Sequence, residues 1–332
     1  MAHPIWKDYI ITIPNVDRFG YLVYFGNTLV YEGKAYRKPG ASAIDIKIND
    51  ICADYINKST LPITFPMAGG TAQPYIFEFQ VVASESESLN FQQTVQFLYD
   101  WSYDFTKDYT TEPILSAPIL RKIPRNAPLV YSATSGNTYI EILGNGDFSM
   151  AFNSDFRLGN ISTLPGESVA INIFDLSNVE GNEVRVYGGN SVNIYTIVDG
   201  CYRYMLYYLN AYGGWDFLLV EGKDMQTDNY TRHTIGQAYN NDLSRNRGTR
   251  NYRNDVSRKW QLHTLWIDDA GAQNMHHLLG STDVYLYDMQ TEQLHPITLN
   301  NSACEYKTYS NNGNQLVRFD IEATLAQNLT RR

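Results

Sequence analysis

Residues 201–221 decide the fold class: they read Cys-Tyr-Arg-Tyr-Met-Leu-Tyr-Tyr-Leu-Asn-Ala-Tyr, then Gly-Gly, then Trp-Asp-Phe-Leu-Leu-Val-Glu. A long run of aromatic and aliphatic residues is typical of a β-strand. Gly213 and Gly214 predict a tight turn, because glycine adopts backbone conformations that other residues avoid. The run from Trp215 to Glu221 predicts the returning strand, so the segment is expected to form a β-hairpin.

The residues before this hairpin carry similar signals. Ile44, Ile46 and Ile48 alternate with Asp45 and Lys47, which predicts a strand with one buried face. Other strands are expected at 9–13, 21–25, 29–31, 35–37, 75–82, 138–143, 148–152, 169–174, 183–187 and 191–198. A turn is expected at 32–34, a short helical turn after residues 49–50, and either a helix or a strand at 91–101.

The residues after the hairpin predict more strands and one helix. Asp268 and Asp269 are suited to cap a helix from Ala270 to Leu279, because acidic residues satisfy free N–H groups at a helix start. Strands are expected at 260–266, 284–287, 296–299, 304–309 and 316–323. No internal repeat of fixed period is visible.

The expected fold class is mainly β, with β-barrel or β-sandwich domains and one C-terminal α-helix inserted between strands. Three domains are expected. Residues 1–112 form an N-terminal β-meander, 113–200 an immunoglobulin- or fibronectin-like β-sandwich, and 201–332 a C-terminal β-domain that holds the helix. The first and last domains are candidates to pack together, and residues 118–128, with three prolines, suggest a linker.

Composition limits the classes of function. The 332 residues carry a net charge of −9, which disfavours global attraction to nucleic acid or anionic membrane. Only 18% of residues are charged while 26 are Tyr, as expected where partner subunits cover part of a surface. Cys52, Cys201 and Cys304 form no CxxC pair, which indicates reduced thiols and folding in a cytoplasm. The first residues do not have the pattern of a signal peptide and no apolar run reaches ~18 residues, so neither a signal peptide nor a transmembrane helix is expected.

Candidate chemical groups all have simpler structural interpretations. His276 and His277 are adjacent on the expected helix and point about 100° apart, so they do not readily bind one metal ion. His233, His263 and His295 have no ligand at suitable spacing. No nucleophile elbow or phosphate-binding loop occurs. We therefore expect no catalytic residue, no metal and no cofactor.

Residues 245–259 contain the strongest concentration of basic residues and are expected to form a loop. Three roles are open: a contact with a neighbouring subunit, which we prefer, a solvated loop, or a nucleic-acid contact. Together with the aromatic hairpin, this segment supplies the candidate interface residues, which are Tyr208, Tyr212, Trp215, Arg245, Arg247, Arg250, Arg253 and Trp260.

Residues 209–216, Leu-Asn-Ala-Tyr-Gly-Gly-Trp-Asp, resemble a hairpin of tail and baseplate proteins of phages that infect gut Bacteroidetes. The ending is similar to C-terminal modules of phage tail proteins: Leu-His-Thr-Leu-Trp-Ile at 262–267, His-Leu-Leu-Gly-Ser at 277–281, Val-Tyr-Leu-Tyr-Asp at 284–288, Glu-Tyr-Lys-Thr at 305–308 and Leu-Val-Arg-Phe-Asp-Ile-Glu at 316–322. The resemblance covers roughly residues 200–330, with weaker support from 1–57. It implies a ring- or hub-forming virion component, such as a distal tail or baseplate protein.

The expected function is that of a non-enzymatic structural virion protein that forms an oligomeric ring or hub in a phage tail or baseplate. Its expected partners are copies of itself and other virion proteins, without membrane or nucleic acid, and it would fold and assemble in the host cytoplasm. The first alternative is a carbohydrate-binding or adhesin module. The second is a glycan-cleaving enzyme whose carboxylates are among the 35 acidic residues.

Overall fold

Strands account for 65% and helices for 7% of the residues described by the structure, a computed structural model, which confirms the mainly β class. The structure describes residues 3–5, 8–58, 70–72, 75–84, 91–98, 120–134, 138–144, 146–153, 169–174, 176, 181–188, 190–221, 224–236, 249–267, 271–272, 275–301, 316–327 and 329–331. The chain divides into two compact units. The first comprises residues 1–118, 128–196 and 210–216, and the second comprises 119–127, 197–209 and 217–332.

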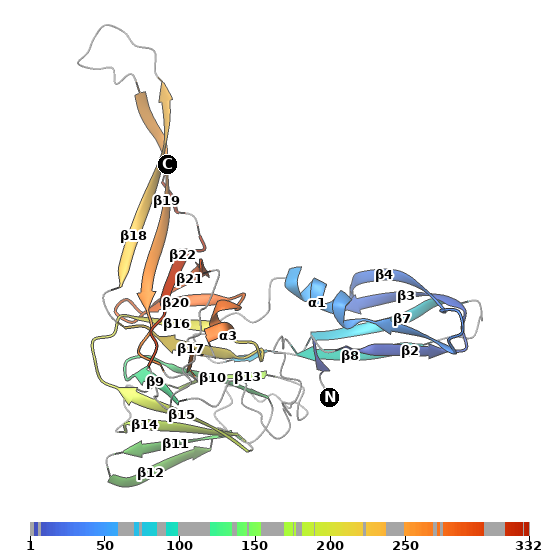
Figure 1. Cartoon of the computed structure of the whole chain (residues 1–332), viewed down its shortest axis with the longest axis horizontal. Coiled ribbons are helices and arrows are strands. Elements are labelled where there is room, and N and C mark those ends of the chain that lie inside the picture. The colour runs from blue at the N-terminus through green and yellow to red at the C-terminus, as the bar shows by residue number, and fades with distance from the viewer. Residues whose placement is uncertain are drawn as a thin grey trace. The chain divides into compact units, whose positions relative to one another are not determined.

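The N-terminal part of the first unit holds a five-stranded sheet in the order β1-β8-β7-β3-β4 and a two-stranded sheet of β2 and β5 (Figure 1). Their bounds are β1 His3–Pro4, β2 Ile10–Pro14, β3 Arg18–Phe25, β4 Thr28–Tyr36, β5 Ala43–Lys47, β7 Tyr75–Ser84 and β8 Gln92–Leu98. Alternate side chains of these strands are buried, as in β2 and β5, and form a core with Phe77, Phe79 and Phe97. Helix α1, Asn49–Lys58, follows β5 directly.

The remainder of the first unit contains two further sheets. One has the order β12-β11-β14-β15, and the other the order β10-β13-β6. The bounds are β6 Gly70–Ala72, β10 Leu129–Thr134, β11 Thr138–Gly144, β12 Gly146–Asn153, β13 Val169–Phe174, β14 Glu183–Gly188 and β15 Ser191–Val198. The strict alternation of burial along β14 and β15 explains why the sequence pattern identified both strands.

The second unit is built on one large antiparallel sheet in the order β17-β16-β20-β21-β22-β19-β18, with β23 paired to β19. Its elements are β9 Leu120–Pro124, β16 Tyr204–Leu209, β17 Trp215–Leu219, β18 Met225–Gly236, β19 Thr249–His263, α3 Met275–Leu279, β20 Val284–Asp288, β21 Gln293–Leu299, β22 Asp320–Leu325 and β23 Leu329–Arg331. The buried core contains Leu206, Tyr208, Trp260, Leu262 and Leu286.

The predicted aromatic hairpin is present as β16 and β17, with Gly213 at φ 78° in the turn. Asn210 shapes this turn, because its Oδ1 accepts hydrogen bonds from the backbone N–H of Tyr212 (3.0 Å) and Gly214 (3.1 Å). Helix α3 lies between β19 and β20 in the chain, as expected for a C-terminal helix inserted between strands.

Two local predictions were wrong, and one open alternative was decided in favour of a strand. The turn expected at 32–34 lies inside the continuous strand β4. The linker expected at 118–128 contains strand β9 and the buried side chains of Ile123 and Ala127. The ambiguous segment 91–101 forms strand β8 in its described part. The strand expected at 304–309 and the caps Asp268 and Asp269 lie outside the described residues. The division into three domains stays a prediction.

Candidate functional site

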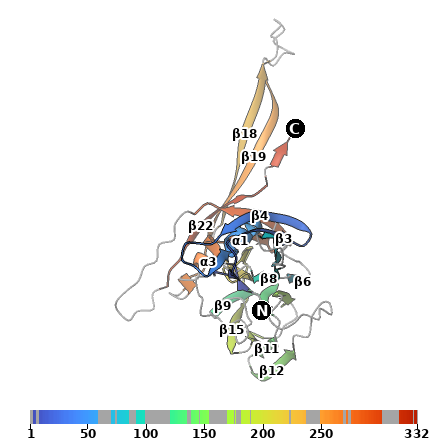
Figure 2. The same cartoon turned by 90° about the vertical axis from the view of Figure 1, so that its right-hand side faces the viewer.

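Strands β18 and β19 form an antiparallel hairpin that continues beyond the other strands of its sheet (Figure 1 and Figure 2). We call residues 225–236 of β18 and residues 249–261 of β19, which pair with them, the arm. On its other side β19 pairs with β23 over 254–256 and with β22 from residue 259 onward. Within the described part of the chain, residues 249–253 therefore have β18 as their sole strand partner.

The arm exposes both of its faces towards its tip, while Val256 and Trp260, nearer the rest of the sheet, are buried. Nearly every residue of β18 is accessible, and Tyr230 and Tyr252 are each 58% exposed, one on each strand. Met225 and Ile235 are also large apolar residues with about half of their surface exposed. A two-stranded ribbon without a covered face is marginally stable in water. The arm is therefore the part of the second unit best suited to contact another molecule.

Ion pairs join the two strands of the arm. The guanidinium of Arg258 donates two hydrogen bonds to the carboxylate of Asp228, from Nε at 2.8 Å and from a terminal nitrogen at 3.0 Å. These hydrogen bonds lower the pKa of Asp228. Asp255 lies 2.7 Å from Nε of Arg253 and 2.9 Å from Nε2 of His233. Both acidic residues of the arm are thus already paired within it.

The arm is basic although the chain is acidic. Its residues include five Lys or Arg and two Asp, a net charge of +3, which leaves −12 for the rest of a chain whose net charge is −9. Because both aspartates are neutralised locally, the surplus positive charge is available to a partner. Opposite charges on two surfaces favour their encounter and fix their orientation.

The root of the arm, where β18 begins and β19 ends, contains a carboxyl group with a shifted pKa. Asp224 directly precedes β18, and burial raises its pKa to about 6, although the positive charges of His263, Arg203 and Arg318 act in the opposite direction. In the described part of the chain, Oδ1 of Asp224 is buried and has no hydrogen-bond partner. The backbone closes the root, since the N–H of Glu221 donates to the carbonyl of His263 at 2.8 Å.

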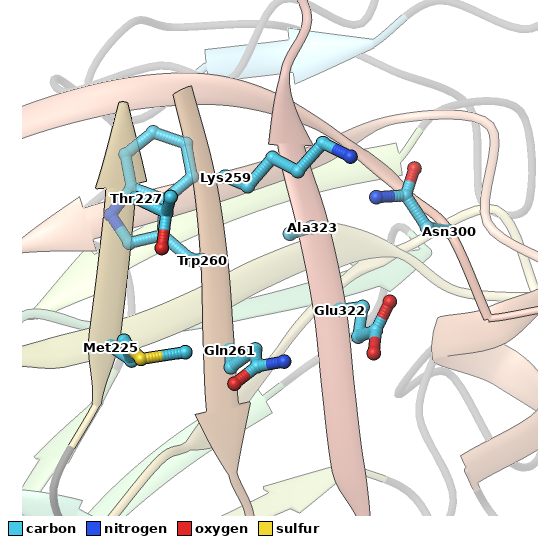
Figure 3. Close-up of a pocket in the computed structure, with 8 residues that line it drawn as sticks. All are labelled: Met225, Thr227, Lys259, Trp260, Gln261, Asn300, Glu322 and Ala323. Carbon is cyan, nitrogen blue, oxygen red and sulfur yellow. The ribbon is translucent and has the colours of Figure 1, made fainter. Parts of the chain in front are cut away.

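A small pocket lies on the sheet surface beside the root (Figure 3). It has a volume of about 120 Å³ and is lined by Met225, Thr227, Lys259, Trp260, Gln261, Asn300, Glu322 and Ala323. In Figure 3 the amine of Lys259 points towards Asn300, while Gln261 and Glu322 lie next to each other on neighbouring strands. Pockets for drug-sized ligands usually exceed about 300 Å³. This pocket suits water or one polar side chain of a partner.

The predicted interface residues fall into two groups. Tyr208, Trp215 and Trp260 are buried by the chain itself. Tyr208 and Trp260 belong to the core of the second unit, and the backbone N–H of Trp215 donates to Oγ of Ser132 at 2.8 Å. These three residues therefore stabilise the folded chain.

Of the other predicted interface residues, some are accessible and some lie outside the described residues. Tyr212 is half-buried, and Arg253 is exposed on β19. Arg250 also belongs to β19, whereas Arg245 and Arg247 lie outside the described residues. The loop expected at 245–259 was wrong from residue 249 onward, where the chain forms β19. Residues 249–255 are mostly polar on both faces, so the alternating pattern of a half-buried strand is missing there, although Val256, Trp260 and Leu262 further along β19 are buried.

Other candidate chemical groups of the described residues do not gather into a metal site. His276 and His277 are neighbours on α3 with ring centroids 4.0 Å apart, and His277 is buried. Among the described residues, no group of three or more His, Cys, Asp or Glu is placed to hold a metal ion. Cys52 is buried and Cys201 exposed, and each is a free thiol. No described helix has both the length and the apolar character needed to cross a membrane.

Comparison with protein-family models, with curated proteins and with solved structures finds no match for this chain.

Proposed function

We propose that this chain is a non-enzymatic structural subunit of an oligomeric assembly, and that the arm joins each subunit to the next. The observation that carries the proposal is the exposure of Tyr230 and Tyr252 on a charged two-stranded ribbon, most of whose described residues are accessible. Tyrosine and arginine are the residue types that contribute most to protein interfaces. A partner surface would cover the tyrosines and neutralise the net positive charge of the arm.

The assembly that we propose is a ring or hub in a phage tail or baseplate. Support for this finer assignment comes from the sequence resemblance of residues 209–216 and 262–322. A ring needs two different patches on each subunit, because each copy contacts the next head to tail. The arm would be one patch, and an acidic surface of the neighbouring copy would be the other. Such a subunit would fold and assemble in the host cytoplasm and leave as part of the virion.

The test replaces the two exposed tyrosines of the arm by serine, as Tyr230→Ser/Tyr252→Ser. Removal of a central interface tyrosine costs about 2 kcal/mol of binding free energy, or roughly 30-fold in dissociation constant. We expect the wild-type chain to form a closed oligomer, seen by light scattering and negative-stain microscopy. We expect the variant to form smaller species at the same concentration with an unchanged melting temperature.

The matched control is Trp266→Ser, because Trp266 is 57% exposed but lies outside the arm. This variant should assemble like the wild type. A chain that stays monomeric at every concentration and is absent from purified phage particles would overturn the proposal. If the wild type and the double tyrosine variant assemble equally well, the arm is not the contact between subunits.

A further inference from the structure

Strand β4 is the outermost strand of the five-stranded sheet and presents an unusual edge. It is nine residues long, and in the described part of the chain no strand pairs with its outer side. Leu29, Tyr31 and Tyr36 are 48%, 41% and 64% exposed. A long exposed edge with large apolar residues is a template for another strand. Proteins avoid such edges unless something covers them.

The buried face of the sheet ends abruptly at β4. Phe19, Tyr21 and Val23 of β3 are all buried on this face. Their partners across the ladder are Ala35, Gly33 and Tyr31 of β4, none of which is buried. The small residues Ala35 and Gly33 leave the edge of the core thinly covered.

A stack of aromatic rings occupies the space above Gly33. The ring of Tyr21 stacks on Phe79 at 5.3 Å and lies 5.8 Å from the ring of Tyr31. A Cβ atom at position 33 would approach Cζ of Tyr21 to 2.6 Å and Cε1 of Tyr31 to 2.7 Å. Glycine at this position thus lets two tyrosine rings lie against the backbone at the middle of the strand.

The opposite face of β4 carries one exposed acid and one exposed base, Glu32 and Lys34, on either side of Gly33. In an antiparallel pair of identical strands centred on Gly33, Glu32 of each copy stands opposite Lys34 of the other. Directly opposed charges of opposite sign stabilise a strand pair, and like charges destabilise it. Slipping the register by two residues in either direction places Glu32 opposite Glu32 or Lys34 opposite Lys34.

A slip by one residue is excluded by the pleat. Successive side chains point to opposite faces, so such a slip would set core-facing residues against solvent-facing ones. The centred register alone matches both charges and both faces. It also places Tyr31 opposite Ala35 of the other copy. The tyrosine of one copy would then cover the part of the core that the small side chain of Ala35 leaves exposed in the other.

We infer that β4 is a homodimer contact, in which two copies of this chain pair their β4 strands antiparallel about a two-fold axis at Gly33. The two sheets would join into one continuous ten-stranded sheet, which follows from two five-stranded sheets. Such an interface is isologous, because the same patch serves both copies. It lies on a different surface from the arm and does not depend on the proposed function.

The test uses charge reversal in the full-length chain with sedimentation equilibrium as the measurement. Glu32→Lys alone and Lys34→Glu alone each turn both cross-strand pairs into like-charge pairs, so each should weaken dimerisation by about tenfold or more. The double reversal Glu32→Lys/Lys34→Glu restores opposite charges and should restore the wild-type dissociation constant. Asp45→Lys, an exposed strand residue of the other sheet, controls for net charge.

The register has its own test by disulfide trapping. Tyr31 stands opposite Ala35 of the other copy in the centred register, beyond the bulge at Val30, and opposed Cα atoms are about 4.5–5.5 Å apart, within reach of a disulfide. Tyr31→Cys/Ala35→Cys should therefore form a covalent dimer under mild oxidation. Glu32→Cys/Tyr36→Cys, which matches a register slipped by two residues, should not.

All measurements are repeated with Tyr230→Ser/Tyr252→Ser in the arm, so that contacts through the arm are removed. A dimer that persists there and follows the charge pattern supports the β4 contact whatever the fate of the arm proposal. A monomer at all concentrations overturns it. A dimer that neither single reversal weakens also overturns it, and Glu32 and Lys34 then only protect the edge from pairing.

Discussion

At the scale of the residue, Asp224 makes the free energy of unfolding depend on pH. Burial favours the neutral carboxyl group, so the pKa of Asp224 rises from 3.8 to about 6. Between about pH 4 and pH 6 the folded chain keeps this proton while the unfolded chain releases it. The contribution of Asp224 to the free energy of unfolding therefore falls as the pH rises through this window and stays low above it.

We predict that Asp224→Asn stabilises the chain at neutral pH. The amide keeps the shape of the side chain but removes the buried charge. The gain should be about 1–2 kcal/mol at pH 7.5, after allowance for partial solvent screening, and should vanish near pH 3.5. Urea unfolding of both proteins at the two pH values measures it. A gain of equal size at both pH values would show that charge is not its cause.

At the scale of the element, Gly33 and Gly236 make opposite predictions for the same substitution. A Cβ atom at Gly33 would collide with the rings of Tyr21 and Tyr31, whereas one at Gly236 meets nothing within 4 Å. Gly33→Ala should therefore destabilise the chain by about 1–2 kcal/mol, because the rings must move. Gly236→Ala should change the stability by less than about 0.5 kcal/mol. Thermal unfolding of the two variants compares them directly.

The same elements show what the sequence can and cannot predict. Strand β5 was predictable, because Ile44 and Ile46 face a core and alternate with polar residues. Strand β4 was missed at Gly33, since glycine between charged residues resembles a turn until its tyrosine neighbours are known. The outer part of the arm was missed because a ribbon exposed on both faces has no hydrophobic period.

The candidate interface residues show a second limit of sequence reasoning. Tyr208, Trp215 and Trp260 were chosen for their residue type, which is shared by interfaces and cores, and the fold places all three in the interior. Asp224 carried no signal in the sequence, because its pKa is raised by burial, which arises only once the chain has folded.

For the whole molecule, the separation of charge predicts a salt-sensitive assembly. The arm carries +3 and the remaining residues −12. Contacts between such surfaces weaken as ions screen them, with a screening length of about 8–10 Å near physiological salt and about 3 Å at 1 M. We predict that assembly through the arm decreases as NaCl rises from 50 to 500 mM. Light scattering across this range measures it, and assembly that strengthens with salt would instead indicate a purely apolar contact.

Two kinds of contact in one chain would define the symmetry of the assembly. Head-to-tail contacts through the arm would close a ring, and a two-fold contact through β4 would join two copies from different rings. If both proposals hold and the assembly is closed, its symmetry is dihedral. The charge-reversed β4 variants should then yield single rings, and the arm variants should yield isolated dimers.

The continuity of β19 has a mechanical consequence. One strand of 15 residues runs from the exposed arm into the sheet, where residues 259–263 pair with β22. Hydrogen bonds in antiparallel pairs stand perpendicular to the strands. Tension along the arm therefore loads all bonds between β19 and β22 together in shear, rather than opening them one after another. A subunit held in this way would pass a pulling force directly from its neighbour into its own core.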